Sequence, residues 1–184
     1  MFSLDLGDGA KLTLLEHRHA QDVFNLVDGN REHLRAWLPW IDGTKTVDDS
    51  RNFIRSSLEK FARNDGFDAG IWQDGRLAGV IGLHYISWSH RRTYLGYWLG
   101  KEYTGRGLMT KACEAVLEHC FTALDLNNVG SAAATGNAPS NAVLRRVGFQ
   151  FEGATREAEW LYDHFVDHNA YSILQREWHA KQNP

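Results

Sequence analysis

The strongest constraint on the fold is a strand, a turn and a helix in the middle of the chain. Residues 93–99 (TYLGYWL) are apolar at both odd and even positions, which predicts a central strand buried on both faces. The glycine-containing turn YTGRGLM follows, and after it apolar side chains recur at the 3.6-residue period of an amphipathic helix that reaches Leu124. A strand buried on both faces needs neighbouring strands and covering helices, so this unit predicts a layered domain built on a sheet.

Apolar patterns elsewhere supply the remaining elements. Asp74-Gly75 between two apolar runs predicts a hairpin, because Asp-Gly suits tight two-residue turns. The expected elements are a strand over 11–16, a pair of short helices over 19–37 (counted as one element), a helix over 47–61, strands over 67–73, 76–86 and 93–99, a helix over 109–124, a strand over 129–134, a helix over 140–147, and a hairpin over 149–160 and 165–174. The order β-α-α-β-β-β-α-β-α-β-β indicates an α+β fold with a mixed, mostly antiparallel central sheet flanked by helices.

Composition limits the classes of function. With 184 residues, 43% of them hydrophobic, the chain is long enough for one domain over 1–184 with a sizeable core. Lys and Arg number 20 against 23 Asp and Glu, which argues against direct binding of duplex nucleic acid by a broad basic face. No stretch of about 18 apolar residues is present, so no membrane span is expected. Cys113 and Cys120 are expected to be reduced core thiols of a cytoplasmic protein.

Two loops carry residues suited to binding or catalysis. In the turn before the long helix, Gly105 and Gly107 allow consecutive backbone N–H groups to converge at the helix N-terminus, where phosphates bind, and Arg106 adds a positive charge. An ordinary strand-to-helix turn is the alternative. Further along, Asn137 and Ser140 precede a short helix, and from the residues alone helix capping is the simpler explanation for both.

Taken together, four blocks resemble the GNAT superfamily of acyl-CoA-dependent N-acetyltransferases. They are residues 96–110, GN-x-x-SN-x6-GF over 136–149, EG-x4-AE over 152–159, and VDHNAYSIL over 166–174. These details, with the tryptophan-rich LRAWLPW over 34–40, are similar to the RimJ/RimL-type ribosomal-protein N-terminal acetyltransferases. The chain departs from the superfamily loop Q/R-x-x-G-x-G/A at Thr104 and Met109, a change that leaves the expected backbone contacts intact.

The resemblance implies acetyl-CoA as the co-substrate. Its pantetheine arm would pair with the backbone of the strand over 93–99, and its pyrophosphate would bind the N–H groups of the glycine turn. Asn137 would hydrogen-bond the arm of the cofactor. The cofactor-binding residues expected on this basis are Trp98, Leu99, Arg106, Gly107, Leu108, Met109, Thr110 and Asn137.

The resemblance also implies roles at the reacting groups. Ser140 would protonate the leaving thiolate, and Glu159 would take the proton from the incoming amine. A carboxylate is a weak base unless burial raises its pKa, so Glu159 is expected in an apolar setting, with Trp160 and Tyr162 as walls. Glu157, which shares the strand parity of Glu159, is the alternative base. The residues expected to line the acceptor site are Trp37, Trp40 and His84.

Histidines and cysteines do not suggest another chemistry. His164 and His168 would share a strand face, but no carboxylate-and-histidine set at ligand spacing accompanies them, so no metal is expected. No cysteine precedes Ser140 on the neighbouring strand, so direct attack by the amine in a ternary complex is the expected mechanism.

The predicted function is acetyl-CoA-dependent N-acetylation of a protein or peptide N-terminal α-amine. An α-amine has a pKa of about 7.7–8.0 and suits a weak carboxylate base better than a lysine at about 10.4. Acetylation of a small-molecule amine, such as an amino sugar, an antibiotic or an aminoacyl conjugate, is the alternative within enzymes. A non-catalytic acyl-CoA-binding module is the alternative from another class, and it would not need both Ser140 and Glu159. A homodimer is left open.

Overall fold

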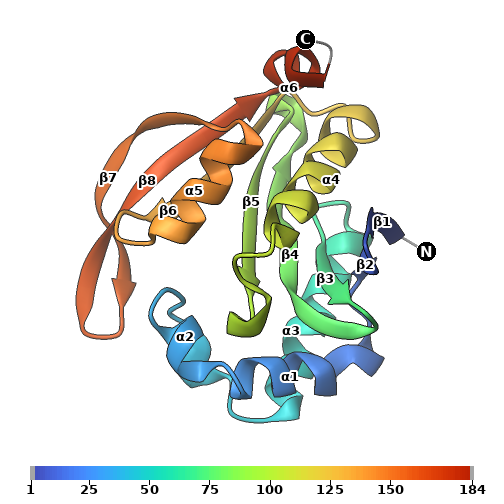
Figure 1. Ribbon diagram of the computed structural model, residues 1–184, viewed down its shortest axis with the longest axis vertical. Helices are drawn as coiled ribbons and strands as arrows, with labels where there is room; N and C mark the ends of the chain where they lie inside the picture. The colour runs from blue at the N-terminus through green and yellow to red at the C-terminus, as the bar shows by residue number, and fades with distance from the viewer. Residues whose placement is uncertain (1–2, 183–184) are drawn as a thin grey trace.

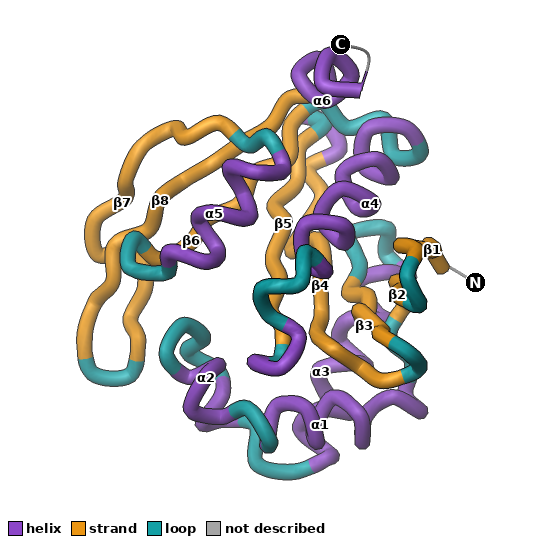
Figure 2. The backbone as a smooth tube through the Cα atoms, in the orientation of Figure 1, coloured by secondary structure: helices purple, strands orange, loops and turns teal. Residues whose placement is uncertain are grey.

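The computed structural model describes residues 3–182, and its eight strands form one sheet (Figures 1 and 2). The strands lie in the order β1-β2-β3-β4-β5-β6-β8-β7. Only the β5–β6 pair is parallel, so the predicted α+β fold with a mixed, mostly antiparallel sheet is confirmed. The strands are β1 (Ser3–Gly7), β2 (Ala10–Leu14), β3 (Asp68–Gln73), β4 (Arg76–Ser87), β5 (Arg92–Leu99), β6 (Asn128–Ala134), β7 (Gln150–Leu161) and β8 (His164–Leu174).

Helices cover the sheet on both faces. Buried side chains of α4 and α5 pack with those of β3, β4 and β5 into one hydrophobic cluster, and those of α1 and α3 form a second cluster with Trp72, Leu77 and Val80. The helices are α1 (Ala20–Asp28), α2 (Arg31–Arg35), α3 (Val47–Ala62), α4 (Leu108–Thr122), α5 (Ala138–Val147) and α6 (Gln175–Gln182).

Local sequence explains where several elements begin and turn. Thr46 and Asp49 form a capping box, in which each side chain accepts a hydrogen bond from the backbone N–H of the other, and α3 starts there. Asp74 and Gly75 both have positive φ in the β3–β4 hairpin, as the Asp-Gly pair predicts. Gly148 ends α5 in the left-handed conformation.

Two terminal elements were not predicted. β1 precedes the expected first strand and pairs only with β2, so the predicted order lacks its first strand. Its leucines, Leu4 and Leu6, are only partly buried, because β1 is an edge strand. The helix α6 is short and mostly polar, but it places Trp178, which is fully buried, against Phe121 of α4.

The strands β5 and β6 pair over a short distance and then separate. Their paired residues run only from Arg92–Asn128 to Tyr94–Gly130. At the point of separation Ser131 Oγ donates a hydrogen bond to the Leu95 carbonyl (3.0 Å). Beyond it, residues 96–99 are only half-buried, so the prediction that the whole strand is buried on both faces is wrong over its second half. The missing β6 neighbour leaves this part of β5 open to a cavity.

Candidate active site

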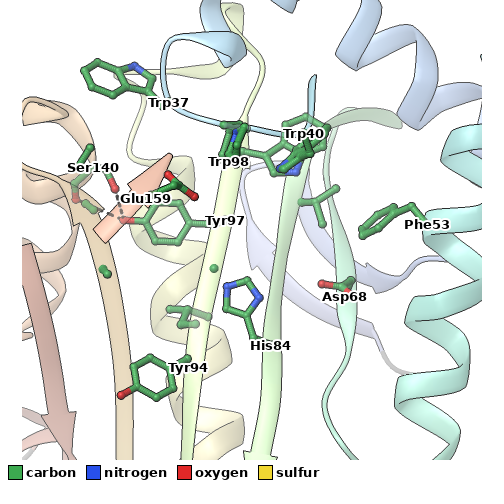
Figure 3. Close-up of a pocket in the computed structure, with 18 of the residues that line it drawn as sticks. Trp37, Trp40, Phe53, Asp68, His84, Tyr94, Tyr97, Trp98, Ser140 and Glu159 are labelled. Carbon is green, nitrogen blue, oxygen red and sulfur yellow. Dashed lines mark hydrogen bonds between the residues drawn. The ribbon is translucent and has the colours of Figure 1, made fainter. Parts of the chain in front are cut away.

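A cavity of about 900 Å³ lies beside the gap between β5 and β6. Side chains of α1, α3, β3, β4, β5, β6, α5, β7 and β8 and of the loop after α2 line it. Figure 3 shows Ser140 and Glu159 close to Trp37 in one part of the cavity, and His84, Asp68 and Phe53 in the other. The cavity brings together seven of the residues predicted for the site: Trp37, Trp40, His84, Trp98, Asn137, Ser140 and Glu159.

The backbone of β5 offers unpaired hydrogen-bonding groups toward the gap. Gly100 N–H donates to the Ala78 carbonyl (2.9 Å), so the backbone groups of Gly100, and by alternation those of Trp98, point toward β4. Those of Leu99 and Tyr97 then point the opposite way, as the Ser131 contact with Leu95 also indicates. Of the two predicted cofactor contacts on this strand, Leu99 faces the gap with its backbone, whereas Trp98 reaches the cavity with its side chain.

The hydroxyl of Ser140 lies on the wall of the cavity next to Tyr97. The two side-chain oxygens are 3.0 Å apart and share a hydrogen bond, and Tyr97 also contacts the Ser140 carbonyl at 3.3 Å (Figure 3). Burial raises the pKa of Tyr97 well above its usual value, so its hydroxyl stays protonated at neutral pH. Tyr97 was not predicted for the site. The sequence does not distinguish it from Tyr94, the other tyrosine of the same strand.

Asn137 is a helix cap that also reaches the cavity. Its side-chain oxygen accepts a hydrogen bond from Ser140 N–H (3.2 Å), so the capping interpretation holds for this residue. Because Asn137 also lines the cavity, capping does not remove it from the site. Through this bond Asn137 fixes the start of α5 and thereby the position of Ser140.

Glu159 lies on the cavity wall with His168 of the neighbouring strand. Glu159 Oε2 is 3.4 Å from His168 Nε2, and the two side chains are 30% and 22% exposed. The pair was not predicted, although His168 was noted for its place on the strand face. His164, on the same strand, instead contacts Asp163 at the hairpin end.

The structure separates Glu159 from Glu157. The β7–β8 register shifts between Thr155 and Glu159, so β7 carries extra residues there. Glu157 lies in this irregular stretch with φ of 47°, and its N–H donates to Asp167 Oδ1 (2.8 Å). Its side chain is exposed and does not line the cavity that holds Glu159 and Ser140. The assumption of equal parity is therefore wrong, because the bulge interrupts the alternation.

The walls predicted for Glu159 are also wrong. Trp160 points away from the cavity and packs edge-on against Phe165, with both rings exposed. Tyr162 donates a hydrogen bond to the Leu38 carbonyl (2.6 Å) and lies under the Arg35 guanidinium. Successive strand residues point to opposite faces, so Trp160 cannot share the face of Glu159.

A bulge in β4 turns His84 into the cavity. The β4–β5 register shifts between Leu83 and Ile86, and the His84 ring lies over Gly96 of β5. A Cβ atom at Gly96 would be 2.4 Å from His84 Nε2, so only glycine leaves room for the ring. Burial, and then the nearby Lys60 cation, lower the pKa of His84, while Asp68 opposes the shift. His84 is therefore neutral at pH 7, and it faces the cavity rather than the closed core.

The glycine turn lies outside the residues that line the cavity. Gly105 and Gly107 both have positive φ, and no atom lies within 4 Å of a Cβ built on either. The helix α4 follows directly, and its first turn leaves backbone N–H groups without helical partners. The predicted residues here are Arg106, which is exposed, Gly107, Leu108 and Met109, whose side chains are buried, and Thr110, to whose hydroxyl Arg146 of α5 donates a hydrogen bond at 3.3 Å.

The structure also describes the thiols, the grouping of possible metal ligands and the hydropathy of the helices. Cys113 and Cys120 are free and buried in α4, as predicted. Among residues 3–182, no three His, Cys, Asp or Glu side chains are grouped so that they could hold a metal ion. Within the same range, no helix has the length and hydropathy needed to cross a membrane.

Comparison with known proteins assigns the family. A family model described as an acetyltransferase (GNAT) domain matches residues 11–150. The chain belongs to the GNAT acetyltransferase family. YdaF of Bacillus subtilis, provisionally named a ribosomal N-acetyltransferase, is 33% identical over 99% of this chain and 100% of its own length. The ribosomal-protein-serine acetyltransferase of Escherichia coli is 25% identical over 94% of this chain and 96% of its own length.

Solved structures of relatives have a similar fold to this GNAT acetyltransferase. The microcin C7 self-immunity acetyltransferase MccE, in complex with acetyl-CoA and AMP, is 25% identical with a TM-score of 0.87, over 92% of this chain and 94% of that chain. RimL in complex with CoA is 24% identical with a TM-score of 0.91, over 94% and 98% of the two chains, and shares the fold. Membership of this family makes the chain an acetyltransferase. The enzyme is therefore favoured over the alternative of a non-catalytic acyl-CoA-binding module.

Proposed function

We propose that this acetyltransferase transfers the acetyl group of acetyl-CoA to the α-amine of a protein N-terminus, by direct attack in a ternary complex. The observation that carries the proposal is that Ser140 and Glu159 line one cavity at the gap between β5 and β6. The names of YdaF and of the ribosomal-protein-serine acetyltransferase of Escherichia coli support a ribosomal-protein acceptor.

The residues present fit acetyl-CoA. The backbone groups of Tyr97 and Leu99 face the gap, where an extended pantetheine arm would add like a strand to β5. The first turn of α4 offers backbone N–H groups and the positive end of the helix dipole to a pyrophosphate. Leu108 and Met109 would act through these N–H groups, because their side chains belong to the core. Arg106 and Arg146 add positive charge beside the turn.

The residues of the cavity account for the proton movements of the reaction. Acetyl-CoA supplies the thioester carbonyl that the amine attacks. The acceptor ammonium loses two protons in forming the amide: Glu159 is placed to pass one to solvent, directly or through water, and the other replaces the proton that Ser140 gives to the leaving thiolate. Tyr97 shares a hydrogen bond with Ser140, so it holds the serine hydroxyl in place throughout.

The position of the thiols supports direct attack. Burial raises the pKa of Cys120 to about 12 and that of Cys113 further, so neither is a thiolate at neutral pH. Both lie in α4 and neither lines the cavity. A cysteinyl acyl intermediate therefore has no nucleophile in the cavity.

A small-molecule acceptor is the second candidate. MccE was solved with AMP as well as acetyl-CoA, and the cavity of this chain has flat aromatic walls in Trp37, Trp40 and Trp98 (Figure 3). Tryptophan rings of this kind can stack on a nucleobase. An aminoacyl nucleotide would offer an α-amine and a base together.

An acceptor screen tests the proposal. Release of CoA thiol is measured with acetyl-CoA and peptides that begin with different residues, against the same peptides with a formylated α-amine, free lysine side chains and aminoacyl nucleotides. We expect thiol release only where a free α-amine is present, and mass spectrometry should place the acetyl group there. Acetylation of lysine side chains alone contradicts the proposal.

The proposal includes a single catalytic domain over 1–184, a cytoplasmic location and a homodimer. Support for the domain is the single eight-stranded sheet, whose strands run along the chain from β1 (Ser3–Gly7) to β8 (His164–Leu174). Light scattering on the purified protein tests the homodimer, and fractionation of the source cells tests the location.

A further inference from the structure

The cavity contains an ion pair that the predicted site does not use. Lys60 Nζ of α3 lies 2.8 Å from Asp68 Oδ2 of β3, and both residues line the cavity (Figure 3 shows Asp68). Their side chains are only 17% and 16% exposed. The pair Arg63–Asp65, just beyond the end of the same helix, is 62% and 48% exposed. Water therefore screens Lys60 and Asp68 far less than a surface pair.

Backbone contacts hold the pair in place. Lys60 Nζ also donates a hydrogen bond to the Leu83 carbonyl (2.9 Å), at the start of the bulge that turns His84 into the cavity. Asp68 lies over Gly82, where an added Cβ would be 2.3 Å from Asp68 Oδ1. The glycine thus makes room for the carboxylate as Gly96 does for the His84 ring. These contacts fix both charges on the sheet side of the cavity.

A charge count describes what the cavity can accept. Its lining contains three side chains with a formal charge at neutral pH, Lys60, Asp68 and Glu159. Lys60 and Asp68 neutralise each other, and His84 beside them is neutral because its pKa is lowered. One carboxylate, Glu159, is left to meet the ammonium of an acceptor, with His168 as its neighbour. The cavity is therefore complementary to one positive charge.

We propose that the Lys60–Asp68 pair makes the cavity selective for acceptors whose reacting amine is the only charged group that enters the cavity. The inference rests on the proposed function and specifies its substrate class: monoamines whose next groups, such as the first side chains of a peptide, are uncharged. A second cation or an anion would lose its hydration on entering the cavity. No charge would compensate for this loss, because Asp68 and Lys60 already neutralise each other. Selectivity of this kind comes from penalising the wrong ligand.

The two single substitutions of the pair should shift the acceptor preference in opposite directions, and the double substitution should restore it. Lys60→Gln keeps a hydrogen-bond donor for the Leu83 carbonyl but leaves the Asp68 carboxylate unpaired. The kcat/KM for peptides beginning with lysine should therefore rise relative to that for peptides beginning with glutamine. Asp68→Asn leaves Lys60 unpaired and should favour peptides beginning with glutamate. The double variant is neutral again and should regain the wild-type preference. We expect each single variant to shift the ratio of kcat/KM values by about tenfold or more, and Arg63→Gln to leave it unchanged.

Binding measurements separate this inference from the proposed function. Calorimetry on the complex with CoA gives the Kd of the same glutamine, lysine and glutamate peptides without any transfer, and a second peptide set carries these residues at the second position. Shifts of the Kd ratios in opposite directions in the two single variants, cancelled in the double variant, support the charge selectivity. They do so even if no acetyl transfer is seen. Absence of acetyl transfer would refute only the proposed function. Equal losses for all three peptides, or unchanged ratios, overturn the selectivity.

Discussion

At the scale of single residues, the structure separates the backbone and side-chain contributions of Ser140. Its N–H is bound by the Asn137 cap, whereas its hydroxyl contacts Tyr97. Ser140→Ala keeps the first contact and removes the second. The proposed catalytic role of the Ser140 hydroxyl can therefore be tested with the fold of α5 intact.

We expect Ser140→Ala to lower kcat with little change in the affinity for CoA, because protonation of the thiolate matters only as the bond breaks. Tyr97→Phe should reduce kcat less, since it removes only the group that positions the serine. Steady-state kinetics and CoA calorimetry measure the two effects. A loss of CoA affinity in proportion to activity would assign Ser140 to binding instead.

Glu159 and Glu157 form a matched pair on one strand. Glu159→Gln should lower kcat by about 10²–10⁴-fold, the usual contribution of a general base, whereas Glu157→Gln, outside the cavity, should cost far less. CoA binding should persist in both variants. Recovery of Glu159→Gln at high pH would show that the carboxylate serves only to deprotonate the acceptor. The larger loss in Glu157→Gln would refute the assignment.

At the scale of elements, the turn before α4 can be tested against a turn of the same geometry elsewhere. Gly107 and Gly75 have φ of 76° and 78°, and each would place an added Cβ in open space. Gly107→Val and Gly75→Val should therefore impose similar backbone strain. Only Gly107 lies at the expected pyrophosphate site.

We expect CoA at 100 times its Kd to stabilise the wild type and Gly75→Val by about 2.7 kcal/mol, and to stabilise Gly107→Val much less. The valine side chain would occupy the space through which a phosphate approaches the N–H groups of α4. Thermal denaturation with and without CoA measures the difference. Equal shifts in the two variants would place the phosphate elsewhere.

Element by element, the sequence predicted what local patterns determine. The helix α4 has a complete 3.6-residue apolar repeat, and the β3–β4 hairpin has an Asp-Gly turn, so both were predicted correctly. The edge strand β1 and the polar helix α6 lack such patterns. They depend on tertiary contacts instead: Leu4 and Leu6 pack, partly buried, against the core, and Trp178 is buried in it.

At the scale of the whole molecule, three histidines with lowered pKa couple stability to pH. Burial lowers the pKa of His19, His84 and His119 from 6.5. Between their folded pKa values and 6.5 the unfolded chain binds more protons than the folded chain, so the free energy of unfolding falls as the pH falls. The carboxyl groups with lowered pKa, such as Asp42 and Asp49, change the free energy of unfolding with pH only below about pH 4.

We therefore expect the Tm to decrease as the pH is lowered from about 7 to about 5, by about 2–4 °C for each kcal/mol lost. His84→Gln should make the decrease shallower, because it removes one of the three groups. Calorimetry at a series of pH values in constant ionic strength measures both. A Tm that is constant or rises toward pH 5 contradicts the prediction.

Part of the site could be predicted because its residues lie in short motifs. Ser140, Asn137 and the glycine turn each sit at a helix start, where spacing alone indicates a function for backbone or side chain. His168, Lys60 and Asp68 carry no such signal, since each is a single polar residue in an ordinary strand or helix. Only the packing of α3 on β3 and of β7 on β8 places them in the cavity.

The sequence by itself determined the α+β fold, the helix α4 with its glycine turn, and the candidates Ser140 and Glu159, because periodicity, turn residues and family blocks are local properties of the chain. The tertiary structure decided how these parts combine. Separation of β5 from β6 opens the cavity. The β7 bulge places Glu157 outside the cavity, and the β4 bulge turns His84 into it. Strand separation and bulges depend on pairing between distant residues, which no local pattern specifies.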